Sequence, residues 1–231
     1  MVIKVVFSIP DSVPFQVCKL SDPGINKCMK SAIQSALPLL RDGLPEYEIA
    51  PIEPIVIPEW IVPARPPLNY EQKHKNWIIH NFAGSTVKDA QIHFNNADFF
   101  LTIIAHNPEI SARLEYQYDN AILDGIDVSS TGFFSYTYNG VELQIDFHGK
   151  IEKQIRFTEA KLRIISIEKF NSKFESNETE KIKVMVNYYN ENAQYLVATE
   201  KRGYEMSYAN ALMAIANNVF SKFPAEKLFI S

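Results

Sequence analysis

The residues that could carry out chemistry in this chain are few, and its two cysteines come first. Cys18 and Cys28 are the only cysteines among 231 residues and lie ten positions apart. This spacing fits neither a zinc knuckle nor a Cys-x-x-Cys redox pair, and no further cysteine could complete a tetrahedral sulfur site. Two states of the cysteines remain open. One is a disulfide that closes a short loop and indicates an oxidising compartment, and the other is two free thiols in a cytosolic protein.

The histidines and carboxylates form no catalytic or metal-binding pattern. No two histidines have the His-x-x-x-His spacing, and acidic pairs such as Asp124 and Asp127 are common in chains of this size. The nucleophile elbow, the phosphate-binding loop, the dinucleotide fingerprint and the His-Glu-x-x-His motif are all missing from the sequence. We therefore expect no enzymatic activity, no metal site and no cofactor. The histidines are His74, His80, His93, His106 and His148.

The charge and the hydropathy of the chain limit the classes of partner that we expect it to bind. The formal net charge is −4 and no dense run of Lys and Arg occurs, so we expect no nucleic-acid partner. No stretch of 18 apolar residues is present, so we expect no stable membrane insertion. The apolar start, Met1 to Phe7, is shorter than a signal-peptide core, and we interpret it as the end of a mature chain. The triplet Asn177-Glu178-Thr179 is a glycosylation sequon and points weakly to secretion.

The N-terminal third contains one helix and one extended segment. Asp22-Pro23 is a start signal, apolar residues then recur with helical spacing, and Gly43 with Pro45 ends the helix. The following segment, 49–67, is rich in proline, which cannot donate to a sheet ladder. Its interleaved Ile, Val and Trp residues are too apolar for a solvated linker. We predict an extended segment at a sheet edge.

Residues 68–170 alternate between apolar and polar positions, which predicts antiparallel strands with one buried face. The clearest examples are Ile110–Tyr118 and Val141–Phe147. No alternation of strands and helices is present, so a parallel-sheet fold is not expected. Short turns are predicted between the strands at 83–85, 106–108, 139–140 and 148–149, and Asn139-Gly140 is the strongest hairpin signal.

After a polar interruption at 171–181, the pattern predicts one very long helix over 190–223. Between Tyr204 and Phe220 the only formal charge is Glu205, so the helix is apolar around most of its circumference. Such a helix must be buried, and a sheet wrapped around it would bury both. The predicted fold class is α+β: a long C-terminal α-helix wrapped by a highly curved antiparallel sheet, with a short N-terminal helix. We expect one domain over 1–231.

Both ends of the chain resemble the insect Takeout/juvenile-hormone-binding-protein family. At the N-terminal end the match covers the two cysteines, a Gly-Leu-Pro-Glu turn at 43–46 and the Pro-Ile-Glu-Pro segment at 51–54. At the C-terminal end it covers the sequence from Ala214 to Phe229, which includes Phe-Ser-Lys-Phe-Pro. The central strands match mainly in pattern.

The resemblance implies a long helix inside a curved sheet, a mostly apolar internal tunnel and a carrier function in extracellular fluid such as haemolymph. It also implies a disulfide between Cys18 and Cys28. The juvenile-hormone binders of the family carry a second disulfide, for which this chain has no cysteines. The chain is therefore more similar to the Takeout branch, for which the resemblance implies longer lipids such as fatty-acyl or polyprenyl chains rather than juvenile hormone. A juvenile-hormone-like terpenoid stays open as an alternative ligand. We expect a monomer that binds a small hydrophobic ligand.

Candidate lining residues are the inward strand positions and the apolar faces of the two helices. Met206 and Met213 could adapt to varied ligands, and the first helix could act as a gate that hinges near Pro38 and Gly43. The predicted ligand-binding residues are Leu37, Leu40, Leu114, Tyr116, Phe134, Tyr136, Leu143, Ile145, Tyr204, Tyr208 and Leu212.

Two other functions remain open. A membrane-surface or protein-interaction module of the same fold would need an exposed basic or apolar tip, and the nearest candidates are Lys73, His74, Lys75 and Trp77. An esterase or isomerase acting on lipids has no motif in the sequence.

Overall fold

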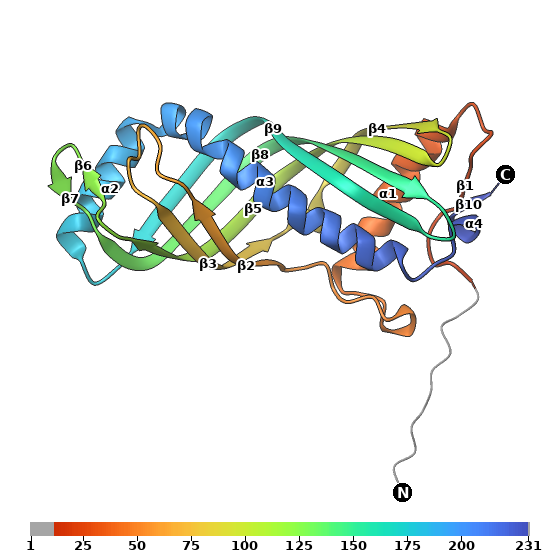
Figure 1. Cartoon of the computed structure of the whole chain (residues 1–231), viewed down its shortest axis with the longest axis horizontal. Coiled ribbons are helices and arrows are strands. Elements are labelled where there is room, and N and C mark those ends of the chain that lie inside the picture. The colour runs from red at the N-terminus through yellow and green to blue at the C-terminus, as the bar shows by residue number, and fades with distance from the viewer. Residues whose placement is uncertain (1–11, 231) are drawn as a thin grey trace, which may run out of the picture.

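Six strands of the computed structural model form one antiparallel sheet, which organises the rest of the chain (Figure 1). The structure describes residues 12–230, without the side chains of 193–200, so the predicted mature start at 1–7 lies outside it. The order is β2-β3-β5-β8-β9, and β4 pairs with the first half of β5 while β3 pairs with the second half. The strands are β2 (Ile55–Val62), β3 (Gln72–His80), β4 (Thr86–Asn95), β5 (Asp98–Tyr118), β8 (Ser130–Ile151) and β9 (Ile155–Glu175).

The three longest strands bend along a common line near their middle. Gly140 lies between two paired rows, one through Asn139 and one through Val141, and it opposes Pro108 on β5 and Glu168 on β9. It has a φ of +58°, and a Cβ there would lie 2.3 Å from the Glu168 side chain. The register of β8 with both neighbours is kept through Gly140, but its inward positions change there from even numbers to odd numbers. The strands therefore bend together at this line without a β-bulge. The line therefore divides the interior into two ends.

Three of the four predicted turns are wrong, two of them at this bend. The segments 106–108 and 139–140 lie inside β5 and β8, and 148–149 is a register shift close to the end of β8. A glycine with positive φ permits a bend inside a strand as well as a hairpin turn, and Gly140 permits a bend. The predicted turn at 83–85 is confirmed, because a 3₁₀ helix, η2 (Phe82–Gly84), joins β3 to β4.

The predicted helices are confirmed, with a change at the C-terminal one. Helix α1 (Ile25–Arg41) ends where Gly43 adopts a φ of +80°. The long helix is α3 (Ala193–Phe220), and a separate helix, α2 (Thr179–Glu191), precedes it. The segment interpreted as a polar interruption is the end of β9 followed by the first turn of α2. Its polar residues face outward while Phe174 is buried, so the alternation continues there.

Helix α3 lies along the edge strand β9 and also contacts β2, so it closes the gap between the two edges of the sheet. Two polar side chains of α3 hydrogen-bond to the backbone of β9. The Glu205 carboxylate accepts from the Ile164 N–H at 2.8 Å, and the Asn217 amide bonds to both the N–H and C=O of Phe157. These bonds explain two polar residues on an otherwise apolar helix, because they pair backbone groups that β9 leaves open at its bulges.

Helix α1 covers a third edge strand, β4, in the same way. The Asn26 side chain accepts a hydrogen bond from the Ile92 N–H at 2.9 Å. The Gln34 side chain accepts from the Val87 N–H at 2.7 Å and donates to the Ser85 carbonyl at 3.2 Å. Both helices therefore cover a sheet edge with apolar faces turned inward. The buried apolar residues of both ends form one continuous cluster.

The chain termini meet beside α1. Strand β1 (Cys18–Lys19) pairs in parallel with β10 (Phe229–Ile230), which follows the short helix α4 (Ala225–Leu228). The disulfide between Cys18 and Cys28 is confirmed and joins β1 to the first turn of α1. In the described part of the chain, no helix combines the length and the hydropathy needed to cross a membrane. The remaining elements are η1 (Pro45–Tyr47) and the hairpin of β6 (Ile122–Leu123) and β7 (Ile126–Asp127).

Removing the disulfide with the pair of changes Cys18→Ser and Cys28→Ser is expected to lower the free energy of unfolding. The bond closes a loop with a sequence separation of 10, and the chain-entropy model gives such a loop about 2–3 kcal/mol. For a chain of this size this corresponds to a fall in Tm of about 4–10 °C. Thermal unfolding of the variant and of the oxidised protein would measure it. An unchanged Tm would show that the pairing with β10 holds the arm without the bond.

Candidate functional site

An apolar cavity of the described structure lies at the end of the molecule where α1, β4 and the C-terminal half of α3 meet. It offers about 220 Å³ to the centres of water-sized groups. At roughly 10–15 Å³ of such space per water-sized group, it accommodates on the order of 15–20 heavy atoms. Its walls come from α1, α3, the first half of β5, the second half of β8 and the chain termini.

The two helices contribute their apolar faces to this cavity. On α1 the lining residues follow the helical repeat, and on α3 the same spacing applies to the residues that face them. Small side chains at several of these positions leave the space open, among them Ala36 on α1, Ala105 on β5 and Ala216 on α3. The helix residues in the wall are Met29, Ala32, Ile33, Ala36, Leu37 and Leu40 from α1, and Leu212, Ile215, Ala216, Val219 and Phe220 from α3.

Polar groups are scarce in the cavity wall. Among its lining residues only Gln16 and Ser85 have polar side chains outside the disulfide, and none carries a charge. Gln16 is exposed, so it lies at the edge of the cavity. The Ser85 hydroxyl donates to the Phe82 carbonyl at 2.7 Å and accepts from the buried Asn107 amide at 3.0 Å. The cavity can therefore hold the hydrocarbon part of a ligand, but it offers no side chain that would neutralise an ionised head group.

The other end of the molecule is filled by aromatic side chains. Trp77 is fully buried, and its ring meets those of Tyr204 and Tyr208 edge to face, with centroids 5.3 and 5.1 Å apart. The Tyr136 and Tyr208 hydroxyls are 2.9 Å apart, and burial raises the pKa of both well above the ordinary value. Further ring contacts join Tyr116, Tyr118, Phe134, Tyr138, Phe174 and Tyr189. Such contacts pack an interior rather than line a space.

The predicted ligand-binding residues divide between these two ends. Leu37, Leu40, Ile145 and Leu212 come together in the wall of the cavity. The other seven are not part of that wall. Tyr116, Phe134, Tyr136, Tyr204 and Tyr208 belong to the aromatic packing, and Leu114 and Leu143 are buried in the core.

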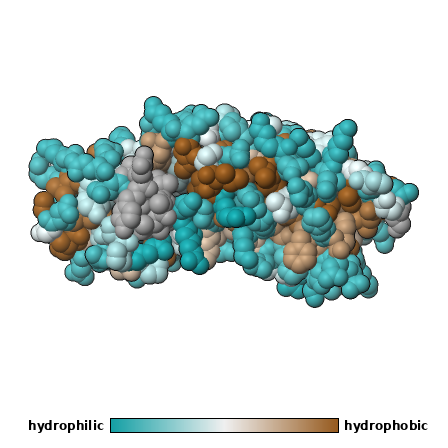
Figure 2. All heavy atoms as spheres, turned by 90° about the horizontal axis from the view of Figure 1, so that it is seen from above, coloured by the Kyte–Doolittle hydropathy of each residue, from teal (hydrophilic) through white to brown (hydrophobic). Residues whose placement is uncertain are grey.

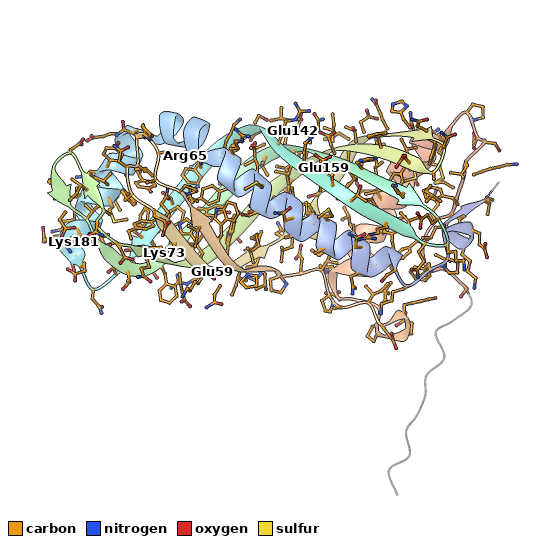
Figure 3. All side chains as sticks on the ribbon, viewed as in Figure 1. Glu59, Arg65, Lys73, Glu142, Glu159 and Lys181 are labelled. Atoms are coloured by element: carbon orange, nitrogen blue, oxygen red, sulfur yellow. A yellow bond between two sulfur atoms is a disulfide. The ribbon has the colours of Figure 1, made fainter. Side chains whose placement is uncertain are left out.

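The residues considered for a surface module form no exposed tip. His74 and Trp77 are both 0% exposed. Lys73 forms an ion pair with Asp119 at 3.0 Å, and Lys75 lies 4.0 Å from Glu59. Figure 3 labels Lys73 on β3 and Glu59 on the neighbouring strand β2. In the described residues no cluster of three His, Cys, Asp or Glu side chains could hold a metal ion.

Acidification is expected to destabilise the protein through His74. Burial lowers the pKa of His74 to about 4, whereas the unfolded chain has a value near 6.5. The folded state disfavours the protonated ring, whereas the unfolded chain takes up the proton freely. The free energy of unfolding is therefore highest above pH 6.5 and falls as the pH drops towards 4. Between about pH 7.5 and about pH 5 the expected loss is ~2 kcal/mol.

Urea unfolding of wild type and of His74→Phe at both pH values would test this. The substitution suits the aromatic surroundings, where the His74 and Tyr204 rings lie 6.2 Å apart. The difference between the two pH profiles isolates this one side chain, because the surface carboxylates are common to both proteins. Equal pH profiles would contradict the assignment.

Sequence reasoning missed most of the strand and terminal residues of the cavity. Phe15 and Gln16 come from the arm before β1, and Leu228 and Phe229 come from the C-terminal segment. The small residues Ala36, Ala105 and Ala216 were the available signal, because small side chains on facing elements leave room between them. The alternation that predicts an inward position does not say how much space faces it.

Comparisons with known proteins agree with this architecture. The sequence model of the family described as "Haemolymph juvenile hormone binding protein (JHBP)" matches residues 1–230. Among solved structures, Takeout 1 of Epiphyas postvittana superimposes with a TM-score of 0.75 at 14% identity, covering 94% of this chain and 100% of that one. A lipopolysaccharide binding protein gives a TM-score of 0.39 at 11% identity over 83% of this chain and 37% of that one, which supports no argument. No curated protein sequence matches.

Proposed function

Because the chain belongs to the haemolymph juvenile hormone binding protein family, we propose that it is a single-domain, monomeric extracellular carrier of a hydrophobic small molecule. The observation that carries the proposal is the apolar, charge-free cavity between α1 and α3. The disulfide supports an oxidising, extracellular location.

The cavity favours a ligand with a neutral, flexible hydrocarbon body. Each buried methylene contributes roughly 0.8 kcal/mol, so ten would give about 8 kcal/mol before the costs of ordering the ligand. That is enough for affinity near the micromolar range. The size of the cavity suits a fatty-acyl chain or a terpenoid of juvenile-hormone size. A long polyprenyl chain would require the aromatic end to rearrange, because rings fill that space.

Native mass spectrometry of the protein secreted by its producing cells, followed by organic extraction, would test the carrier function. We expect an adduct that extracts as a defined lipid. In a second measurement, the affinity for a series of saturated methyl esters should rise with chain length and level off when the cavity is full. At ~0.8 kcal/mol per methylene the initial rise is at most about fifteenfold for every two carbons. A clean unliganded mass, together with no uptake of any ester, would refute a lipid carrier.

Ionised ligands should bind less well than neutral ones of equal length. No charged side chain lines the cavity, so a carboxylate would have to remain at its edge near Gln16. A fatty acid and its methyl ester, compared at a pH where the acid is ionised, would measure the difference. Equal affinities would indicate that the head group of the ligand lies in solvent.

A further inference from the structure

One sequence feature is not explained by the carrier function, namely the triplet Asn177-Glu178-Thr179. It is the only Asn-x-Ser/Thr triplet in the chain. Asparagine in this triplet accepts an N-linked oligosaccharide when the chain passes through the secretory pathway and the side chain is accessible. The fold decides whether this site is accessible.

The triplet lies in the connection between β9, which ends at Glu175, and α2, which begins at Thr179. All three residues are exposed. In the described part of the chain, the Asn177 and Thr179 side chains make no hydrogen bond, ion pair or ring contact. The turn is held by its neighbours, because the Glu178 N–H donates to the Ser176 hydroxyl at 3.2 Å. A sugar on Asn177 would therefore displace no contact of the fold.

The same end of the molecule carries an apolar hairpin tip. Ile122 and Ile126 flank the turn between β6 and β7, and they are 51% and 49% exposed. Lys181, in the first turn of α2, ties the helix to this hairpin, since its ammonium group donates to the Ser129 carbonyl at 2.7 Å and lies 3.5 Å from Asp127. Figure 3 shows Lys181 at this extremity, and Figure 2 shows apolar side chains exposed there.

We propose that Asn177 carries an N-linked glycan and that this glycan shields the apolar tip of the β6–β7 hairpin. Asn177 precedes the start of α2 by two residues, and Lys181 in the first turn of that helix contacts the hairpin segment, so a branched oligosaccharide on Asn177 would extend beside the hairpin. It lies at the opposite end from α1 and the cavity, so ligand entry stays unobstructed (Figure 1). The proposal rests on the extracellular location in the proposed function.

The modification is a group transfer from a lipid-diphosphate-linked oligosaccharide. A bond forms between Nδ2 of Asn177 and C1 of the first sugar, and the bond between C1 and the diphosphate oxygen breaks. The lipid diphosphate leaves with the bonding electrons, and Nδ2 gives up one proton. The Thr179 hydroxyl completes the acceptor triplet that the transferase recognises.

Intact mass spectrometry of the chain secreted from cultured insect cells behind an added secretion leader would test occupancy. Wild type should carry the mass of one N-glycan, and peptide-N-glycosidase should remove it and leave aspartate at position 177. Asn177→Gln and Thr179→Ala should lose the glycan, whereas Thr179→Ser should keep it. Asn171→Gln, at an exposed asparagine outside the triplet, is the matched control and should also keep it. Unmodified wild type recovered from the medium would overturn the proposal.

Sedimentation velocity before and after enzymatic removal of the glycan would test the shielding. Removal should shift the protein to larger species, and the pair Ile122→Ser and Ile126→Ser should abolish that shift. If removal leaves the sedimentation unchanged, shielding is refuted. The carrier function can be refuted independently of the glycan. Secreted, glycosylated protein that takes up no lipid would refute the carrier function alone. Lipid-loaded but unmodified protein would refute the glycosylation of Asn177 alone.

Discussion

Ala216→Phe is expected to lower the affinity for a long-chain neutral ligand about a hundredfold. Ala216 lies in the cavity wall on α3, one helical turn from Leu212 and Phe220, which line the same wall. A phenyl ring at this position would occupy the volume of about four methylenes of the ligand. At roughly 0.8 kcal/mol for each methylene, the loss is about 3 kcal/mol, which is a factor of ~100 in Kd. Titration with a fluorescent fatty-acyl probe would measure it.

Ala214→Phe is the matched control for this experiment. Ala214 is two residues away on the same helix, is exposed, and is not part of the cavity wall. The control should bind the probe as wild type does, and the circular dichroism of both variants should match wild type. Retention of full affinity by Ala216→Phe, with the fold intact, would place the ligand outside this cavity.

Asn107→Ala is expected to cost about 4 kcal/mol of unfolding free energy. Asn107 is 0% exposed and lies on β5 at the common bend of the three long strands. Its amide donates to the Asn81 carbonyl at 2.7 Å and to the Ser85 hydroxyl at 3.0 Å, and its oxygen accepts from the Glu109 N–H at 2.8 Å. Alanine would break these three bonds, which contribute about 0.5–1.5 kcal/mol each, and would leave unfilled space at a buried position that costs about 1 kcal/mol more.

Asn171→Ala is the appropriate comparison, because Asn171 is an exposed asparagine on β9 that bonds to the half-buried Asn139. An exposed substitution of this kind should change stability by less than about 0.5 kcal/mol. Chemical denaturation with both variants would measure the difference. If the two variants were equally stable, the network around Asn107 would contribute little, and the bend would depend on Gly140 and Pro108 alone.

The sequence predicted the helices well because their signals are local. Asp22-Pro23 and Gly43 marked the limits of α1, and the scarcity of charge after Tyr204 marked α3 as an enclosed helix. The proline-rich segment is confirmed at the sheet edge, where β2 lies. The turns at 106–108 and 139–140 were wrong because a Pro or Gly signal fits a bend inside a strand as well as a turn. Only the pairing of β5, β8 and β9 distinguishes the two, and that pairing depends on residues far apart in sequence.

The predicted site shows a similar limit. Alternation along the strands gave inward positions correctly, since Leu114, Tyr136 and Leu143 are all buried. It could not tell which inward positions face open space. That depends on the side chains of the opposite wall: rings at Trp77 and Tyr208 fill one end, whereas small residues such as Ala36 and Ala216 leave the other open.

The way the helices cover the sheet edges has a consequence for release of cargo. If α1 swings away to let a ligand leave, the bonds from Asn26 and Gln34 break and the N–H groups of Ile92 and Val87 on β4 lose their partners. An unpaired strand edge is a template for another chain, so every opening briefly exposes the protein to aggregation by strand addition. A bound lipid that holds α1 closed would therefore also protect the protein from aggregation. Emptied protein should form fibres or amorphous aggregates before loaded protein does.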